Sequence, residues 1–368
     1  AHLTVQFAAA CMSGSLQSRQ ISTSMYSLAK MGAPVDDSLG SALAMAIGAR
    51  ARELDTIGAS NTLWACAKLG WTPSTQCCDA LFERAATLLP QFNSQDLANT
   101  VVGLGGLHAG GATLGGALLA ALHVQIGAKA REMRPLELCT TFTSLAQLPS
   151  APAATLTALL ASARAYGVGR LSARDVAMLV HALGKCASPS NAACLENDTC
   201  SFVFEAVGAK AAAGGLNAQD VSTTLIGLAA LMPLMPHTGR MAHTLALIQA
   251  AAGRAPQAFS AQQVANSIWS LAKLLPHAGA DPDGDVAGAA GGAHGAPPHA
   301  DGARVDTASV AALLARAGEC TDEFTPQNMS NFLCGVVRLG LPLPAHVAAR
   351  VAAQLASRVD RYDANALS

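Results

Sequence analysis

The sequence predicts an all-α protein, an α-solenoid coiled as a right-handed superhelix from about eight helix-turn-helix repeats of 38 residues. Composition is the first reason: 51% of the residues are apolar but only 4% are aromatic, which suits closely packed short helices better than a sheet. The second reason is self-similarity, because the segment 61–70 returns at 266–275 with the same Asn, Trp and Lys. A single hairpin leaves one apolar flank uncovered, so the copies are expected to stack.

The repeats are aligned on the position of Trp64, called the anchor below. The eight anchor residues are Tyr26, Trp64, Val102, Thr143, His181, Ile226, Trp269 and Cys334. Three of the seven intervals are 38 residues long, and the longer ones are expected to hold loop insertions. Residues 1–368 therefore form one predicted array, with a polar insertion at 187–199 and a Gly/Ala/Pro/His-rich, flexible insertion at 276–302.

The start of each first helix carries a recurrent signal. Nine residues before the anchor stands a predicted N-cap in most copies: Asp55, Asn93, Ser172, Asn217, Ser260 and Thr325. Three residues later come Asp96, Asp175, Asp220, Gln263 and Asn328, which predict capping boxes. The residue before each cap is large and apolar, and an apolar residue follows five positions later, which is the pattern of a hydrophobic staple.

Helix ends are also marked. Gly32, Gly70 and Gly340 are expected to end first helices. Second helices are predicted at 73–89, 113–132, 153–166 and 345–359. The apolar stretch 98–130 has enough length for a membrane span, but polar residues interrupt it and Gly110 and Gly111 divide it, so it predicts two helices.

Charge and cysteine usage limit the function classes. The formal net charge of −1 excludes a strongly basic surface, so any nucleic-acid site must be local. The ten cysteines include no C-x-x-C pair, which indicates buried packing thiols in a reducing compartment. Zinc ligation by Cys186, Cys194 and Cys200 does not fit the usual spacing. A calcium loop at Asp281, Asp283 and Asp285 lacks the required glycine and acidic positions. We therefore predict no metal and no cofactor.

Four columns of residues are predicted to share one face of the first helices, because offsets of 4, 8 and 11 return to nearly the same angle. The starting column is Arg19, Ile57, Gln95, Leu136, Arg174, Gln219, Gln262 and Gln327. The +4 column is Thr23, Asn61, Asn99, Thr140, Met178, Thr223, Asn266 and Asn331. The +8 column is always small: Ser27, Ala65, Gly103, Ser144, Ala182, Gly227, Ser270 and Gly335. The +11 column is Lys30, Lys68, Gly106, Gln147, Lys185, Ala230, Lys273 and Arg338.

This face holds no Asp or Glu but seven Lys or Arg, although acids slightly outnumber bases in the chain. Stacking would align amides with base edges and cations with phosphates, which suits single-stranded RNA. The predicted RNA-binding residues are Arg19, Thr23, Lys30, Asn61, Lys68, Gln95, Asn99, Thr140, Gln147, Arg174, Lys185, Gln219, Thr223, Gln262, Asn266, Lys273, Gln327, Asn331 and Arg338. The alternative is an ordinary solvated helix face with lysines near helix C-termini. It leaves the mid-helix Asn and Thr unexplained.

The anchor column borders this face. Its ring-bearing residues, Tyr26, Trp64, His181 and Trp269, have two interpretations: base stacking, or packing between adjacent repeats. No nucleophile motif, phosphate loop or paired carboxylates emerge, so an enzyme is not expected.

The segment 61–70, its copy at 266–275 and the Leu97-Ala98-Asn99 triplet resemble the octotricopeptide repeats of green-algal organelle proteins. Related repeats occur in proteins with a RAP domain. The resemblance covers nearly the whole chain outside the insertions. It implies paired-helix repeats and RNA binding in a chloroplast or mitochondrion, in RNA stability, processing, splicing or translation, or on ribosomal RNA. It implies an RNA face at Asn61, Asn99, Asn266, Asn331, Lys68 and Lys273. Ile57, Leu136 and Met178 depart from this pattern.

The predicted partners are therefore messenger or ribosomal RNA and other proteins of a ribonucleoprotein particle, with no membrane span. One rival is a protein scaffold without direct RNA contact, which the neutral net charge favours. The chain opens at Ala1 and stops partway through a motif, so it resembles a piece of a longer protein. A second rival is accordingly a processing enzyme with its catalytic domain beyond Ser368.

Overall fold

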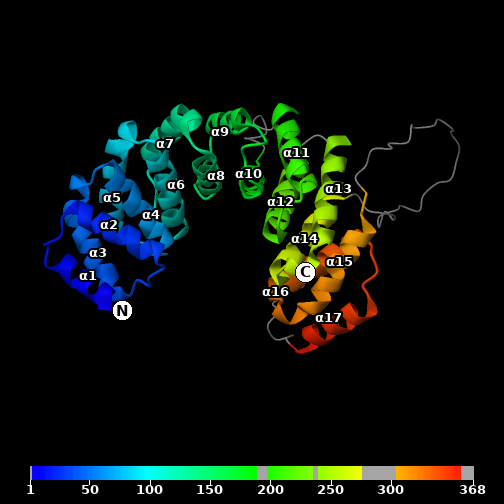
Figure 1. Ribbon diagram of the computed structural model, residues 1–368. Coiled ribbons are helices and arrows are strands. Elements are labelled where there is room, and N and C mark those ends of the chain that lie inside the picture. The colour runs from blue at the N-terminus through cyan, green and yellow to red at the C-terminus, as the bar shows by residue number, and fades with distance from the viewer. Residues whose placement is uncertain (1, 189–196, 235–238, 276–303, 358–368) are drawn as a thin grey trace, which may run out of the picture. The chain divides into compact units, whose positions relative to one another are not determined.

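The fold is all-α, as the sequence predicts. A computed structural model describes residues 2–188, 197–234, 239–275 and 304–357, and every regular element in these ranges is a helix (Figure 1). The α-helices are α1 (His2–Met12), α2 (Ser18–Lys30), α3 (Asp37–Arg50), α4 (Thr56–Lys68), α5 (Thr75–Leu88), α6 (Ser94–Ala109), α7 (Gly116–Lys129), α8 (Pro135–Leu145), α9 (Ala153–Tyr166), α10 (Ala173–Cys186), α11 (Asn197–Ala212), α12 (Ala218–Leu231), α13 (Gly239–Arg254), α14 (Ala261–Leu274), α15 (Thr307–Glu319), α16 (Pro326–Leu339) and α17 (Ala345–Ser357).

Short 3-10 turns follow several of the second helices and lead into the next first helix. They are η1 (Ala51–Glu53), η2 (Leu89–Gln91), η3 (Ala130–Glu132), η6 (Pro256–Ala258) and η7 (Thr321–Glu323), while η5 (Met232–Leu234) follows the first helix α12.

Contacts group the chain into two units, residues 1–170 and 171–368. In the first unit, α2, α4, α6 and α8 pack side by side in chain order, and α1, α3, α5, α7 and α9 form a second layer in the same way (Figure 1). In the second unit, α10, α12, α14 and α16 form one layer and α11, α13, α15 and α17 the other. Each unit is thus a stack of helical hairpins, the contact pattern of a solenoid.

All six predicted N-caps are confirmed. The Asp55 carboxylate accepts the Gly58 N–H at 2.7 Å, and the Asn93 side chain accepts the Asp96 N–H at 2.8 Å. Ser172, Asn217, Ser260 and Thr325 accept the equivalent N–H groups of α10, α12, α14 and α16. Reciprocal capping boxes form at α6, α10, α12 and α14, whereas Asn328 in α16 does not complete one.

The hydrophobic staple residues lie in the core. Leu54, Phe92, Met133, Leu171, Leu216, Phe259 and Phe324 are buried, and so are the apolar residues five positions after them. Leu16, which precedes the first of these helices, is half-buried. This placement fixes the angle at which the chain enters each first helix.

The predicted helix ends are also observed. Gly32, Gly70 and Gly340 have φ of 62°, 62° and 64°, a left-handed conformation in which a Cβ would be strained. The Trp71 N–H donates to the Cys66 carbonyl across Gly70, which closes α4. Second helices begin and end within about three residues of their predicted bounds, and the stretch 98–130 is divided between α6 and α7.

A tertiary hydrogen bond that the sequence analysis missed ties each of three second helices to its own first helix. Arg84 Nε on α5 donates to the Leu54 carbonyl at 2.7 Å, and Arg316 Nε on α15 donates to the Phe259 carbonyl at 3.0 Å. The Tyr166 hydroxyl on α9 donates to the Met133 carbonyl at 2.5 Å. The acceptor is always the staple residue, whose carbonyl would otherwise be buried at the hairpin corner without a partner.

The small +8 column does not share the exposed face with the other three columns, so this part of the prediction is wrong. Seven of its eight residues are buried, and only Ser27 is exposed. A Cβ built on Gly103 would lie 2.5 Å from the Leu63 carbonyl carbon, and one on Gly227 would lie 2.6 Å from that of Val180. The small residues are therefore where the backbones of successive first helices touch.

The two insertions fall largely outside the described residues. Residues 189–196 and the whole of 276–302 are not among them. The last part of the predicted polar insertion, 197–199, forms the first turn of α11 and is helical. Among the described cysteines, eight are buried as expected, whereas Cys334 on α16 is exposed.

The close contact at Gly103 predicts a size limit. Gly103→Ala is expected to destabilise the first unit by about 1–3 kcal/mol, because the α4 backbone must move to admit the methyl group. Gly127→Ala, in α7 of the same unit with open space at its Cβ, is the control and is expected to be neutral or to stabilise by up to about 1 kcal/mol. Urea unfolding followed by circular dichroism measures both. Equal effects would contradict the packing role.

Candidate nucleic-acid interface

The starting, +4 and +11 columns form the candidate surface, called the first-helix strip below. All eight residues of the starting column are exposed. Those of the +4 column are half-buried, except the exposed Thr23. The charged residues of the +11 column are all exposed. The strip is therefore accessible along its two edges and partly sunk at its centre.

The cations of the strip have no acidic partners among the described residues. These are Arg19, Lys30 and Lys68 in the first unit, and Arg174, Lys185, Lys273 and Arg338 in the second. The ion pairs that the structure does show use Arg50, Arg52, Lys129, Arg134, Arg316 and Arg350, all outside the strip. These ion pairs between described residues therefore all lie outside the strip, and none of them neutralises a strip cation.

In the first unit, two lysines converge on a stacked aromatic pair. The rings of Tyr26 on α2 and Trp64 on α4 lie 4.9 Å apart at 35°, which joins neighbouring repeats. Lys30 Nζ lies 5.1 Å from the Trp64 centroid, and Lys68 Nζ lies 6.0 Å from it. Cation–π attraction holds each ammonium there. The packing interpretation of Tyr26 and Trp64 is therefore supported, although both remain half-buried rather than enclosed.

The described part of the second unit has one such contact between a lysine and a tryptophan. Lys273 Nζ lies 3.8 Å from the Trp269 centroid. Burial, and to a smaller extent the nearby charge of Arg338 on α16, lower the pKa of the Lys273 ammonium. The charge of Arg338 on the neighbouring first helix thus acts on Lys273, and neither side chain forms an ion pair with an acid among the described residues.

Amide side chains link the first helices sideways. In the first unit, Gln95 Nε2 donates to Asn99 Oδ1 at 3.1 Å, and Asn99 Nδ2 donates to Asn61 Oδ1 at 3.2 Å. In the second unit, Gln327 donates to Asn331 at 2.9 Å and Asn331 to Asn266 at 3.2 Å, in the same order. Two further bonds, from Gln219 to Thr223 and from Gln263 to Gln219, extend the pattern to α12 and α14. The mid-helix Asn residues thus bridge adjacent repeats as well as facing the strip.

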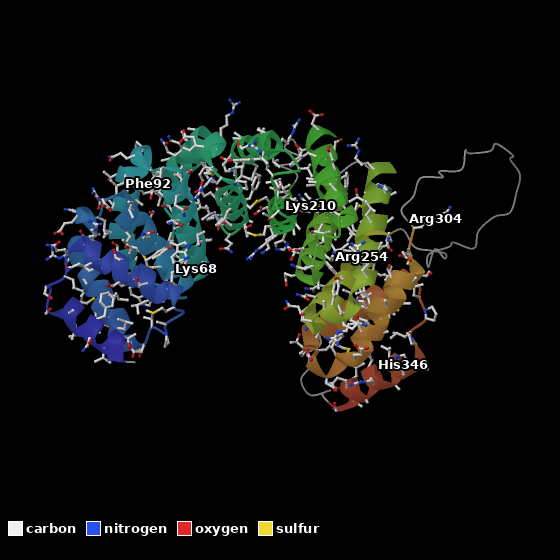
Figure 2. All side chains as sticks on the ribbon, in the orientation of Figure 1. Lys68, Phe92, Lys210, Arg254, Arg304 and His346 are labelled. Atoms are coloured by element: carbon white, nitrogen blue, oxygen red, sulfur yellow. The ribbon has the colours of Figure 1, made fainter. Side chains whose placement is uncertain are left out.

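Several predicted residues take no part in these contacts. Thr23, Thr140, Arg174 and Gln262 make no side-chain hydrogen bond or ion pair within the described ranges. Gln147 lies in the turn after α8, which ends at Leu145, so it is displaced from the helical register. Ile57 and Leu136 are exposed apolar side chains in the starting column. Figure 2 labels Lys68, at the C-terminal end of α4, and Phe92, just before the N-terminal end of the neighbouring first helix α6.

His181 is the fourth predicted stacking residue and lies half-buried on α10. Burial first, and then the charge of Lys185, lower the pKa of its imidazole. Its Nδ1 is buried without a partner in the described part of the chain. A neutral ring is therefore favoured at position 181.

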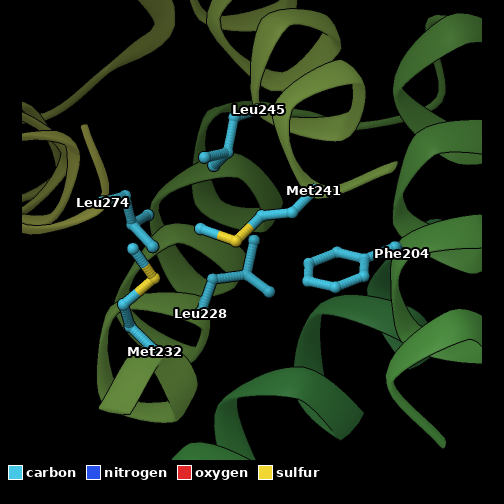
Figure 3. Close-up of a pocket in the computed structure, with 6 residues that line it drawn as sticks. All are labelled: Phe204, Leu228, Met232, Met241, Leu245 and Leu274. Carbon is cyan, nitrogen blue, oxygen red and sulfur yellow. The ribbon is translucent and has the colours of Figure 1, made fainter. Parts of the chain in front are cut away.

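Two cavities lie in the described part of the second unit. Leu228, Leu274 and Met241 help to line an apolar cavity of about 10 Å³ between α11, α12, α13 and α14 (Figure 3), which has room for about one water and no polar group to bind it. A shallower groove of about 360 Å³ lies between α11 and α13, where Glu205 and Arg240 bring opposite charges.

No group of His, Cys, Asp and Glu within the described ranges is arranged to hold a metal ion. None of the helices described combines the length and the apolarity required to cross a bilayer. Neither a protein-family model nor a curated protein matches the chain.

Two histidines, the buried His123 and the half-buried His181, predict that the free energy of unfolding falls in acid. Burial lowers the pKa of the imidazoles of His181 and His123, so the folded chain resists their protonation. The unfolded chain takes up these protons as pH falls through about 6.5. The contribution of these two neutral histidines to the free energy of unfolding is therefore retained above that pH and is lost progressively below it.

Urea unfolding between pH 7.5 and 5.5 is expected to show this loss. His181→Phe should flatten the dependence for the second unit, because the ring remains but no proton binds. His346→Phe, at an exposed position on α17, is the control and should leave the dependence unchanged. An unchanged slope in His181→Phe would exclude the proposed burial effect.

Proposed function

We propose that this chain is an RNA-binding helical-repeat protein that holds single-stranded RNA along its first-helix strips. The observation that carries the proposal is the juxtaposition of like charges: Lys30 with Lys68 around Trp64, and Lys273 beside Arg338. Stacking concentrates cations that no described acid neutralises. A phosphate backbone supplies anions at a regular spacing, which these cations can meet.

The neighbouring groups favour single strands over duplexes. Aromatic rings stack with exposed bases, and amides form hydrogen bonds with base edges. Trp64 and Trp269 each lie three residues after an Asn of the +4 column and four residues before a Lys. An amide, a ring and an ammonium therefore occur together on α4 and on α14, with an equivalent Thr23, Tyr26 and Lys30 on α2.

The biological setting rests on resemblance. Similarity of the repeat to octotricopeptide repeats supports a role in organelle gene expression, in the mitochondrial matrix or chloroplast stroma. Stabilising, processing or translating a transcript, or binding ribosomal RNA within an organellar ribosome, are the activities that this resemblance implies. We propose a binding role and not an enzymatic one.

A protein scaffold is the second candidate. Ile57 and Leu136 favour it, because they are 59% and 68% exposed in the same column as the polar residues. Large exposed apolar side chains can mark a surface that another protein covers. A scaffold would show negligible RNA affinity, whereas several phosphate contacts give a steep dependence of affinity on salt.

The double substitution Lys68→Glu and Lys273→Glu is expected to weaken RNA binding without changing helicity or melting temperature. If each lysine meets one phosphate, the slope of log affinity against log salt should become shallower by about 1.4 in total. Fluorescence anisotropy with a labelled single-stranded RNA at several salt concentrations measures this.

The matched control is Arg131→Glu with Lys210→Glu, which makes the same change of net charge outside the strip, once in each unit. At equal ionic strength this control should change RNA affinity, and the slope of log affinity against log salt, much less than the strip variant does. Equal losses in the two doubles would show that only net charge matters and would remove the strip from the mechanism.

A further inference from the structure

One set of amides in the first unit has a direction fixed by a cation. Arg134 precedes α8 and donates from Nη2 to Gln95 Oε1 at 3.1 Å. Because a guanidinium can only donate, Gln95 must accept through its oxygen and is left to donate through its nitrogen. Its Nε2 donates to Asn99 Oδ1, and Asn99 Nδ2 donates to Asn61 Oδ1. The orientation of three amides thus follows from one arginine.

Arg134 is itself held in place. Its Nε donates to Glu137 Oε1 at 2.8 Å, and Glu137 Oε2 accepts the Arg134 backbone N–H at 2.9 Å and the Ser94 hydroxyl at 3.0 Å. Burial raises the pKa of the Glu137 carboxyl, but these hydrogen bonds outweigh it and hold the pKa below its usual value. The carboxylate therefore stays ionised and anchors the arginine that orients the amides.

The chain of hydrogen bonds ends at Asn61. With its oxygen occupied by Asn99, the Asn61 amide presents its N–H donors, which have no acceptor within the described part of the chain. The groups beside it are the Trp64 ring and the ammonium of Lys68, which is also a donor. The Asn61 side chain is therefore oriented to donate rather than to accept at the centre of this strip.

We propose that the Asn61 site reads the edge of the base that carries position 4 of a pyrimidine or position 6 of a purine. It then favours uracil and guanine, which have an oxygen there, over cytosine and adenine, which have an amino group there. This inference rests on the proposed RNA-binding function. Uracil has an oxygen at position 4 that accepts from Asn61, whereas cytosine has an amino group there that meets another donor and loses its hydrogen bond. The Trp64 ring is already packed against Tyr26, so the discrimination comes from the amide.

The second unit provides an internal comparison. Gln327, Asn331 and Asn266 repeat the same hydrogen bonds, but no guanidinium donates to Gln327 among the described residues. Rotating all three amides by half a turn preserves both bonds and turns the Asn266 oxygen outward. The Asn266 site accommodates either kind of base, so the selectivity of the chain depends on Arg134.

Gln95→Glu tests the direction without removing a side chain. A carboxylate at position 95 accepts from Arg134 and from Asn99, so both asparagines must turn over and Asn61 then presents its oxygen. Gln95 is exposed, and an acid in the first turn of α6 suits the helix dipole, so folding is retained. The control Gln147→Glu adds the same charge to the same unit outside the amide chain, because Gln147 lies in the turn after α8.

The experiment compares anisotropy titrations of oligo(U) and oligo(C) of equal length. The unaltered protein is expected to bind oligo(U) about tenfold more tightly, the effect of one unpaired polar group. Gln147→Glu should weaken both and keep the ratio, and Gln95→Glu should invert it. Equal binding of the two RNAs, or the same ratio in both variants, overturns this inference alone. Failure of the unaltered protein to bind either RNA overturns the proposed function with it.

Discussion

The closeness of successive first helices is the constraint on which the rest of the structure depends. Small residues in the +8 column let the backbones meet, as at Gly103 against Leu63 and Gly227 against Val180. Contact at that point fixes how one helix is rotated and shifted against the next. A larger side chain there would separate the helices and change every sideways contact between repeats.

The hydrogen bonds between amides follow from this spacing. Asn99 reaches Asn61, and Asn331 reaches Asn266, at the same 3.2 Å although the first pair is 38 residues apart and the second 65. A distance that is independent of the number of intervening residues shows that helix packing sets it. The same packing brings Lys30 and Lys68 to one indole ring and Arg338 to Lys273. Adjacent cations without acids are the feature that a phosphate-binding surface requires.

Whether an amide side chain presents its N–H or its oxygen does not follow from where the side chain lies. The two amide chains have the same geometry, yet only the one in the first unit is oriented by an arginine, because Arg134 is present at the N-cap of α8. A hydrogen-bonding group that can face either way gives affinity without selectivity, whereas a fixed donor excludes other donors. The proposed selectivity therefore depends on Arg134 and Gln95, which orient Asn61 from a distance.

The sequence by itself determined the helices and their register, because caps, staples and terminal glycines act within one turn of the chain. Asn93, Phe92 and Gly70 were identified correctly for that reason. Tertiary structure alone decided which side of each helix was covered. The +8 column was wrongly placed on the exposed face. The sequence analysis also did not foresee helix α1 or the hydrogen bonds of Arg84 and Arg316 to the staple carbonyls. Nor did it foresee that Arg134 orients Asn61. These depend on distances between segments far apart in the sequence, which local periodicity does not contain.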